Sequence, residues 1–131
     1  MEPRSDKGVQ SPTLLQSDEI IQELMGREVG ERIERYSVAH VTIPPGGSSL
    51  AHYHPEAVES YLILKGSAWM ELGDETSSLE RGQAILIEPP EPHKIRNDGT
   101  EDLEFLAICW PAWEPTNTIW LDDETRSQGV T

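Results

Sequence analysis

Three histidines and one glutamate stand at spacings that can hold a metal ion. His52 and His54 are separated by one residue, Glu59 follows five positions after His54, and His93 comes thirty-four positions after Glu59. Residues two apart in a β-strand point to the same face, so we expect the rings of His52 and His54 to share one space. Imidazole is a common donor to divalent metals, and one carboxylate offsets part of the metal's charge. The pattern predicts a site for one divalent transition metal, and iron, manganese, nickel, cobalt, copper and zinc all suit it.

A histidine taken singly is more often a hydrogen-bonded core or surface residue. We interpret the remaining histidine, His40, in that way, because it lies in an earlier apolar run away from the other three. His52, His54 and His93 instead fall in or beside short apolar runs bounded by turn formers. Together with Glu59 they favour the metal interpretation.

Two further residues are candidates for catalysis. Tyr61 shares the Glu59 side of its run, because strand side chains alternate, and its hydroxyl could donate a proton near a bound ligand. Packing with a satisfied hydroxyl is the alternative for Tyr61. Glu56 lies in the segment that carries the ligands and is a second candidate, or a replacement carboxylate for Glu59. Asn97, followed by Asp98 and Gly99, is interpreted as a turn residue.

The elements that must position these residues read as short β-strands. Runs rich in β-branched and aromatic residues alternate with turn formers such as Lys65-Gly66 and Gly73-Asp74. An antiparallel, all-β fold follows from this pattern. The predicted strands are 36–43, 59–64, 68–72, 84–87, 93–95 and 103–110.

One short helix is expected before the strands. Ser17 can cap its start, acidic residues follow in the first turn, and the apolar positions between 20 and 25 fall on one helical face until Gly26.

The segment from Gly46 to Gly66 resembles the first cupin motif, G-x5-H-x-H-x4-E-x6-G, with every specified residue present. The second motif, G-x5-P-x-G-x2-H-x3-N, is matched by Gly82, His93 and Asn97, whereas Glu88 stands at its proline and Pro90 at its glycine. The resemblance implies a double-stranded β-helix, the cupin jelly-roll barrel. It also implies that His52, His54, Glu59 and His93 ligate the metal.

The resemblance does not select a reaction, because similar cupins include dioxygenases, decarboxylases, isomerases, lyases and binding proteins. Four protein ligands on a six-coordinate metal leave two positions for a small oxygen-rich metabolite bound through two oxygens. We therefore expect a metal-dependent enzyme of oxygenase, isomerase or lyase type. A non-catalytic module that binds metal or metabolite is the alternative.

Composition limits the partners. Ten basic and 24 acidic residues give a net charge of −14, which disfavours nucleic acid and anionic membranes. No apolar stretch is long enough to span a bilayer, and the single cysteine, Cys109, lies in an apolar run, which suits a soluble cytoplasmic protein.

The chain of 131 residues suits one core. We expect a flexible tail over 1–16, one cupin domain over 17–121 and an acidic polar tail over 122–131. Four tryptophans, three of them at or beyond Trp110, predict packing of the C-terminal segment onto the barrel, a lid or a dimer interface. Because similar cupins often dimerise, a homodimer is expected.

Overall fold

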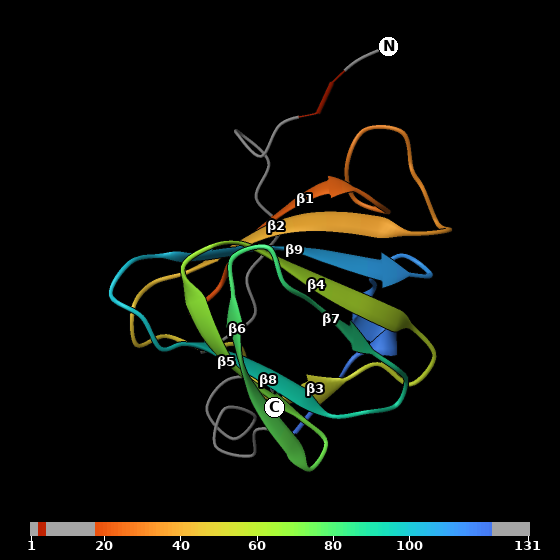
Figure 1. The fold of residues 1–131 in the computed structure, drawn as a ribbon. Helices are drawn as coiled ribbons and strands as arrows, with labels where there is room; N and C mark the ends of the chain where they lie inside the picture. Colours follow the sequence, from red (N-terminus) through yellow and green to blue (C-terminus); the bar gives the residue numbers. More distant parts are fainter. Residues whose placement is uncertain (1–2, 5–17, 122–131) are drawn as a thin grey trace.

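The computed structural model describes residues 3–4 and 18–121, which form two five-stranded antiparallel sheets (Figure 1). The first sheet has the order β1 (Ile20–Met25), β2 (Ser37–Ile43), β9 (Leu103–Trp110), β4 (Val58–Lys65) and β7 (Ala84–Ile87). The second has the order β10 (Ile119–Trp120), β3 (His52–Tyr53), β8 (His93–Asn97), β5 (Ser67–Leu72) and β6 (Glu75–Glu80). A short 3-10 helix, Pro115–Asn117, precedes β10. The expected all-β double-stranded β-helix is confirmed.

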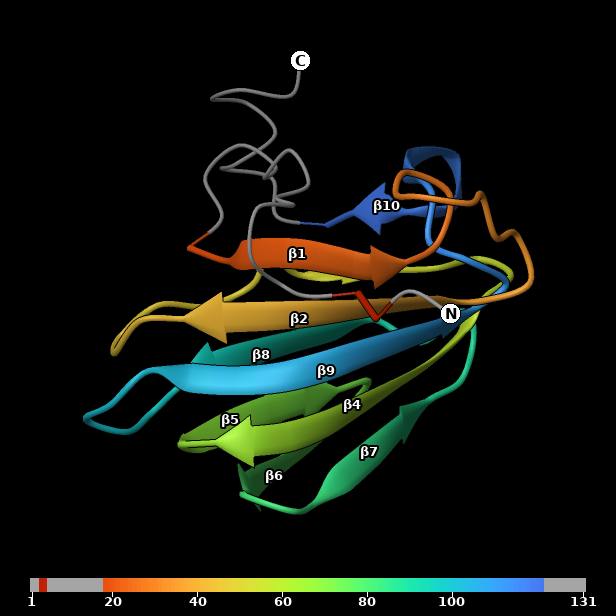
Figure 2. The ribbon, with the colours of Figure 1, turned by 90° about the horizontal axis from the view of Figure 1, so that it is seen from above.

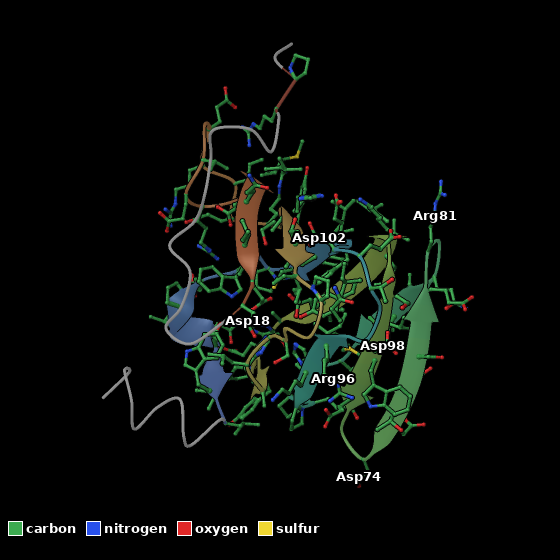
Figure 3. All side chains as sticks on the ribbon, turned by 90° about the vertical axis from the view of Figure 1, so that its left-hand side faces the viewer. Asp18, Asp74, Arg81, Arg96, Asp98 and Asp102 are labelled. Carbon is green, nitrogen blue, oxygen red and sulfur yellow. The ribbon has the colours of Figure 1, made fainter. Side chains whose placement is uncertain are left out.

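The core lies between the two sheets, which Figure 2 shows as two layers. Inward side chains alternate along the central strands, as in Ile63 of β4, Phe105 of β9 and Ile95 of β8, each at most 1% exposed. Figure 3 shows side chains of both sheets filling this space, whereas the labelled Asp74 and Arg81 lie at the two ends of β6. The packed interior gives the site a rigid frame.

The expected helix between Ser17 and Gly26 is wrong for the residues that the structure describes. Residues 20–25 form β1, which pairs with β2 along the edge of the first sheet. Six residues are too few for a stable isolated helix, whereas pairing with β2 supplies backbone hydrogen bonds along the segment. Asp18 fixes its start, because the Ser48 amide donates to Asp18 Oδ2 at 3.0 Å (Asp18 is labelled in Figure 3). Ser17 itself lies outside the described residues.

The predicted strands are confirmed, and β7 and β9 have the predicted bounds. Besides β1, three strands were not predicted: β3 and β10 have two residues each, and β6 is polar except for Leu79. β6 is an edge strand whose other side chains are exposed, so no apolar alternation marks it. None of the described residues forms a helix that could cross a membrane. Apart from Pro3 and Arg4, the predicted tails lie outside the described residues, and the domain bounds stay a prediction.

Asn97 has the structural role that the sequence suggested. Its Nδ2 donates to the carbonyls of Ile43 and Glu101 at 2.9 and 2.8 Å, and its Oδ1 accepts from the Gly99 amide at 2.9 Å. These bonds tie the turn after β8 to the end of β2, so Asn97 fixes the strand that carries His93.

Candidate metal centre

The four residues singled out from the sequence lie together inside the barrel. His52 is in β3, His54 directly follows it, Glu59 is in β4 and His93 begins β8, where it pairs with His52. One potential ligand atom from each residue lies within 4.8 Å of all the others, and all four residues are buried. The cluster therefore has the composition and size of a site for one metal ion.

The Nδ1 atom of each of the three histidines forms a hydrogen bond with a backbone carbonyl. A carbonyl only accepts, so Nδ1 carries the proton and Nε2 keeps its lone pair. Orientation of a ligating imidazole through its other nitrogen is the usual arrangement around protein-bound metals. For His52, His54 and His93 the partners are Leu50, Asn117 and Glu91, at Nδ1···O distances of 2.8, 3.0 and 3.1 Å.

The nitrogens on the other side of two rings meet the carboxylate. His54 Nε2 and His93 Nε2 each lie 3.1 Å from Glu59 Oε1. With the proton on Nδ1, both nitrogens and the oxygen are acceptors, so their approach requires a positive charge between them. A proton or a metal ion supplies that charge, and the donor set fits a divalent transition metal.

The electrostatics of the cluster agree with this reading. Burial and the neighbouring His93 lower the pKa of His52 to about 3, so this imidazole is neutral near pH 7. Burial alone would raise the pKa of Glu59, but hydrogen bonds with His54 and His93 lower it below its usual range. Burial likewise disfavours a charge on His54, yet its hydrogen bond with Glu59 raises its pKa. The site thus combines an ionised carboxylate with imidazole donors.

Comparison with known proteins identifies the family. The cupin domain model matches residues 39–109, and an uncharacterized protein of Methanocaldococcus jannaschii is 32% identical over 111 residues, covering 85% of this chain and 88% of its own. The chain belongs to the cupin family. The substitutions of Glu88 and Pro90 in the second motif leave His93 in the cluster of this cupin.

Two further similarities concern oxalate. The oxalate-binding protein of Thermotoga maritima is 34% identical over 70 residues, which are 53% of this cupin and 58% of that protein. The crystal structure of a predicted oxalate decarboxylase from Thermotoga maritima has a TM-score of 0.71 and 23% identity, covering 82% of this chain and 97% of that one. The similarity to this crystal structure supports the cupin fold of the chain.

A cavity of about 80 Å³ adjoins the cluster. Of the two predicted catalytic residues, Tyr61 lines it and is buried, with its ring centroid 5.9 Å from that of His93. Burial, and next the charge of Glu59, raise the pKa of Tyr61, so its phenol keeps its proton. Glu56 is exposed and is not among the residues that line the cavity. The geometry brings Tyr61, but not Glu56, to the candidate site.

The sequence interpretation missed the contribution of β1 to the cavity, whereas packing of the C-terminal tryptophans onto the barrel was one of its expectations. Glu19, Ile21 and Glu23 line the cavity from alternate positions of one extended segment. The apolar residues of this segment fit a helical face as well, so no spacing in the sequence marked these three residues. Trp113 and Trp120 also line the cavity, and the Trp120 ring lies 5.1 Å from that of His52. These tryptophans cover the centre.

Glu23 gives a test of the cavity's electrostatics. Burial raises the pKa of its carboxyl, although the hydrogen bond from the Glu28 amide opposes this. Below the usual pKa of a carboxyl group, Glu23 is protonated in both the folded and the unfolded chain. As the pH rises from that value through the raised pKa of the folded state, the unfolded chain loses its proton first, so the free energy of unfolding falls. Glu23→Gln removes the titrating group from this position. We expect urea unfolding with chelator to show the variant more stable than wild type at about pH 8, with the difference shrinking towards about pH 4.

A stability difference between Glu23→Gln and wild type that stays the same at all pH values would contradict this prediction. Glu80→Gln, on the exposed edge strand β6, is the matched control and should show no such trend.

Proposed function

We propose that this cupin binds one divalent transition metal through His52, His54, Glu59 and His93 and, on that metal, a small oxygen-rich molecule. The observation that carries the proposal is the set of three Nδ1-anchored histidines, two of which direct Nε2 at the buried Glu59. A structural histidine has no need of this arrangement, whereas a metal ligand does.

The ligand we propose chelates through two oxygens. A bound divalent ion would act as a Lewis acid and template for such a molecule. Oxalate is the first candidate because one relative is named an oxalate-binding protein. The residues of the chain would supply the rest: Tyr61 holds a proton beside the cluster, and Trp113 and Trp120 keep water from the cavity wall.

We favour enzymatic chemistry of the oxygenase, isomerase or lyase type, with Tyr61 as the proton donor. A buried, protonated phenol next to the ligand site supports this choice. Glu56 stays a weaker candidate, because it would have to reach the cavity from an exposed loop position. A non-catalytic binding module is the alternative, and it would bind the same chelators without turning them over.

The test is metal analysis of protein purified without chelators or metal-affinity resin, followed by incubation with oxalate and other bidentate oxygen ligands. Near-stoichiometric metal with release of product, or with oxygen consumption, supports the enzyme. Metal and tight oxalate binding without turnover support the binding module. Protein that takes up no divalent metal, even when metal is added, overturns the proposal.

We also propose that the protein is a cytoplasmic homodimer that associates through the outer face of the first sheet. Ile108 and Leu86 flank Ser60 in the register, and their side chains are 37% and 55% exposed, with Trp110 at 69% on the same face. Apolar side chains gathered on one sheet face favour a protein contact. The cytoplasmic location is supported by the buried free thiol of Cys109, which suits a reducing compartment.

The double variant Leu86→Glu with Ile108→Glu tests this interface. Wild type should show twice the chain mass of 14.7 kDa in light scattering, and the double variant the mass of one chain, because two charges desolvate poorly in an apolar contact. Ser77→Glu on the exposed strand β6 is the control and should remain dimeric. A monomeric wild type would refute the dimer.

A further inference from the structure

One row of residues across the first sheet connects two parts of the cavity wall. The register places Glu23 opposite Ala39, Ala39 opposite Ala107 and Ala107 opposite Tyr61, and all four residues line the cavity. The next row, which ends at Ile63, has large core side chains instead. Two alanines side by side leave room between the two long side chains at the ends of the row.

The two ends of this row carry different chemical groups. Tyr61 lies two positions from Glu59 in β4, at the end nearest the metal ligands, and Glu23 lies in β1 at the other end. Three strand spacings of about 4.8 Å put the two backbones about 14 Å apart. A molecule that chelates the metal and extends over the alanines would therefore reach Glu23 with its far end.

The Glu23 carboxyl is built into this far end. It is 4% exposed, and the Glu28 amide donates to its Oε2 at 3.1 Å. Gly26 lets it lie against the backbone, because a Cβ there would come within 2.7 Å of Glu23 Oε1. Burying a carboxyl is costly, and a hydrophobic residue at this position would avoid the cost. A buried carboxyl kept in a cavity wall is therefore a candidate functional group.

The charges of the wall define what Glu23 can recognise. The described residues that line the cavity include Glu19, Glu23 and Glu59 but no lysine or arginine. Such a wall accepts hydrogen bonds and repels a second anionic group, so it suits a ligand end that donates.

Resting on the metal-dependent function proposed above, we infer that Glu23 is a specificity-determining residue. It binds an ammonium or hydroxyl group at the end of the substrate remote from its chelating oxygens. The substrate class is then an oxygen chelator with a donor-bearing tail, and simple dianions such as oxalate are ligands for the metal end alone.

Three hydroxamates with the same chelating head test this inference: caprohydroxamate, ε-aminocaprohydroxamate and adipic monohydroxamate. Their dissociation constants are measured on metal-loaded protein, by calorimetry or by quenching of tryptophan fluorescence, since Trp113 and Trp120 line the cavity. We expect the amino-tailed probe to bind about 10- to 100-fold more tightly than the alkyl probe, and the carboxyl-tailed probe to bind most weakly.

Glu23→Gln should remove most of the amino-tail advantage while leaving metal content and alkyl-probe affinity unchanged, because Gln can still accept from the Glu28 amide. Glu80→Gln, which removes one negative charge from β6, should keep the advantage. Equal binding of the three probes by wild type, or an advantage that survives in Glu23→Gln, overturns the inference. If wild type holds metal but binds no probe, including caprohydroxamate, the proposed ligand function fails as well, and the tail-less probe distinguishes that case.

Discussion

Replacing His52 and His54 together by alanine is expected to leave the purified protein without bound metal. The two rings supply two of the four donors and are fixed by the carbonyls of Leu50 and Asn117, so nothing in the described residues can replace them. Loss of a group that hydrogen-bonds a metal ligand typically lowers metal affinity by about 10- to 100-fold. Loss of two ligands should therefore weaken metal binding by more than about 100-fold. Elemental analysis after dialysis against trace metal gives the measurement.

The matched control is His40→Ala. His40 lies on β2 outside the cluster, with Nε2 3.1 Å from Glu104 Oε1, so its replacement should leave metal content at the wild-type level. Circular dichroism should show that the double variant keeps its β-sheet signal. Full metal retention in a folded double variant would contradict the ligand assignment, and parallel loss in His40→Ala would make the effect unspecific.

The cluster of four candidate ligands could be predicted because much of its information is local. His52 and His54 share a face through the two-residue period of extended chain, and Glu59 and Tyr61 share one in the same way. His93 begins another short run, which placed it as a candidate ligand, and the resemblance to the second cupin motif supported that placement. The strands β7 and β9 were predicted to the residue, because each is a short, almost continuous apolar run that ends at polar residues or at a proline.

The far wall of the cavity could not be predicted, because its information is not local. The apolar positions in 20–25 fit a helical face as well as a strand, and only the neighbouring strand β2 decides between them. Glu23 enters the cavity as a consequence of that pairing. Arg27 likewise joins the loop after β1 to the C-terminal segment, donating to the Ala112 carbonyl at 3.2 Å and pairing with Glu114 at 3.1 Å. Such contacts leave no spacing rule in the sequence.

Tyr61→Phe is expected to lower turnover by about 10²- to 10⁴-fold on any chelator that the metal-loaded protein converts, the range typical of a lost general acid. The variant removes only the hydroxyl, so the ring keeps its contact with Phe105, at a centroid distance of 4.7 Å, and the core keeps its packing. The Tyr61 hydroxyl hydrogen-bonds Glu59, so turnover is compared at equal metal occupancy of wild type and variant. The measurement is kcat and KM with elemental analysis of the same preparation.

The control is Tyr36→Phe, since the Tyr36 side chain is exposed and its hydroxyl contacts Met25 Sδ at 3.8 Å, away from the cavity lining. A fall in kcat with unchanged KM at equal metal occupancy in Tyr61→Phe alone would support proton donation by this phenol. Unchanged turnover in Tyr61→Phe would assign Tyr61 to packing, in the row that pairs it with Ala107.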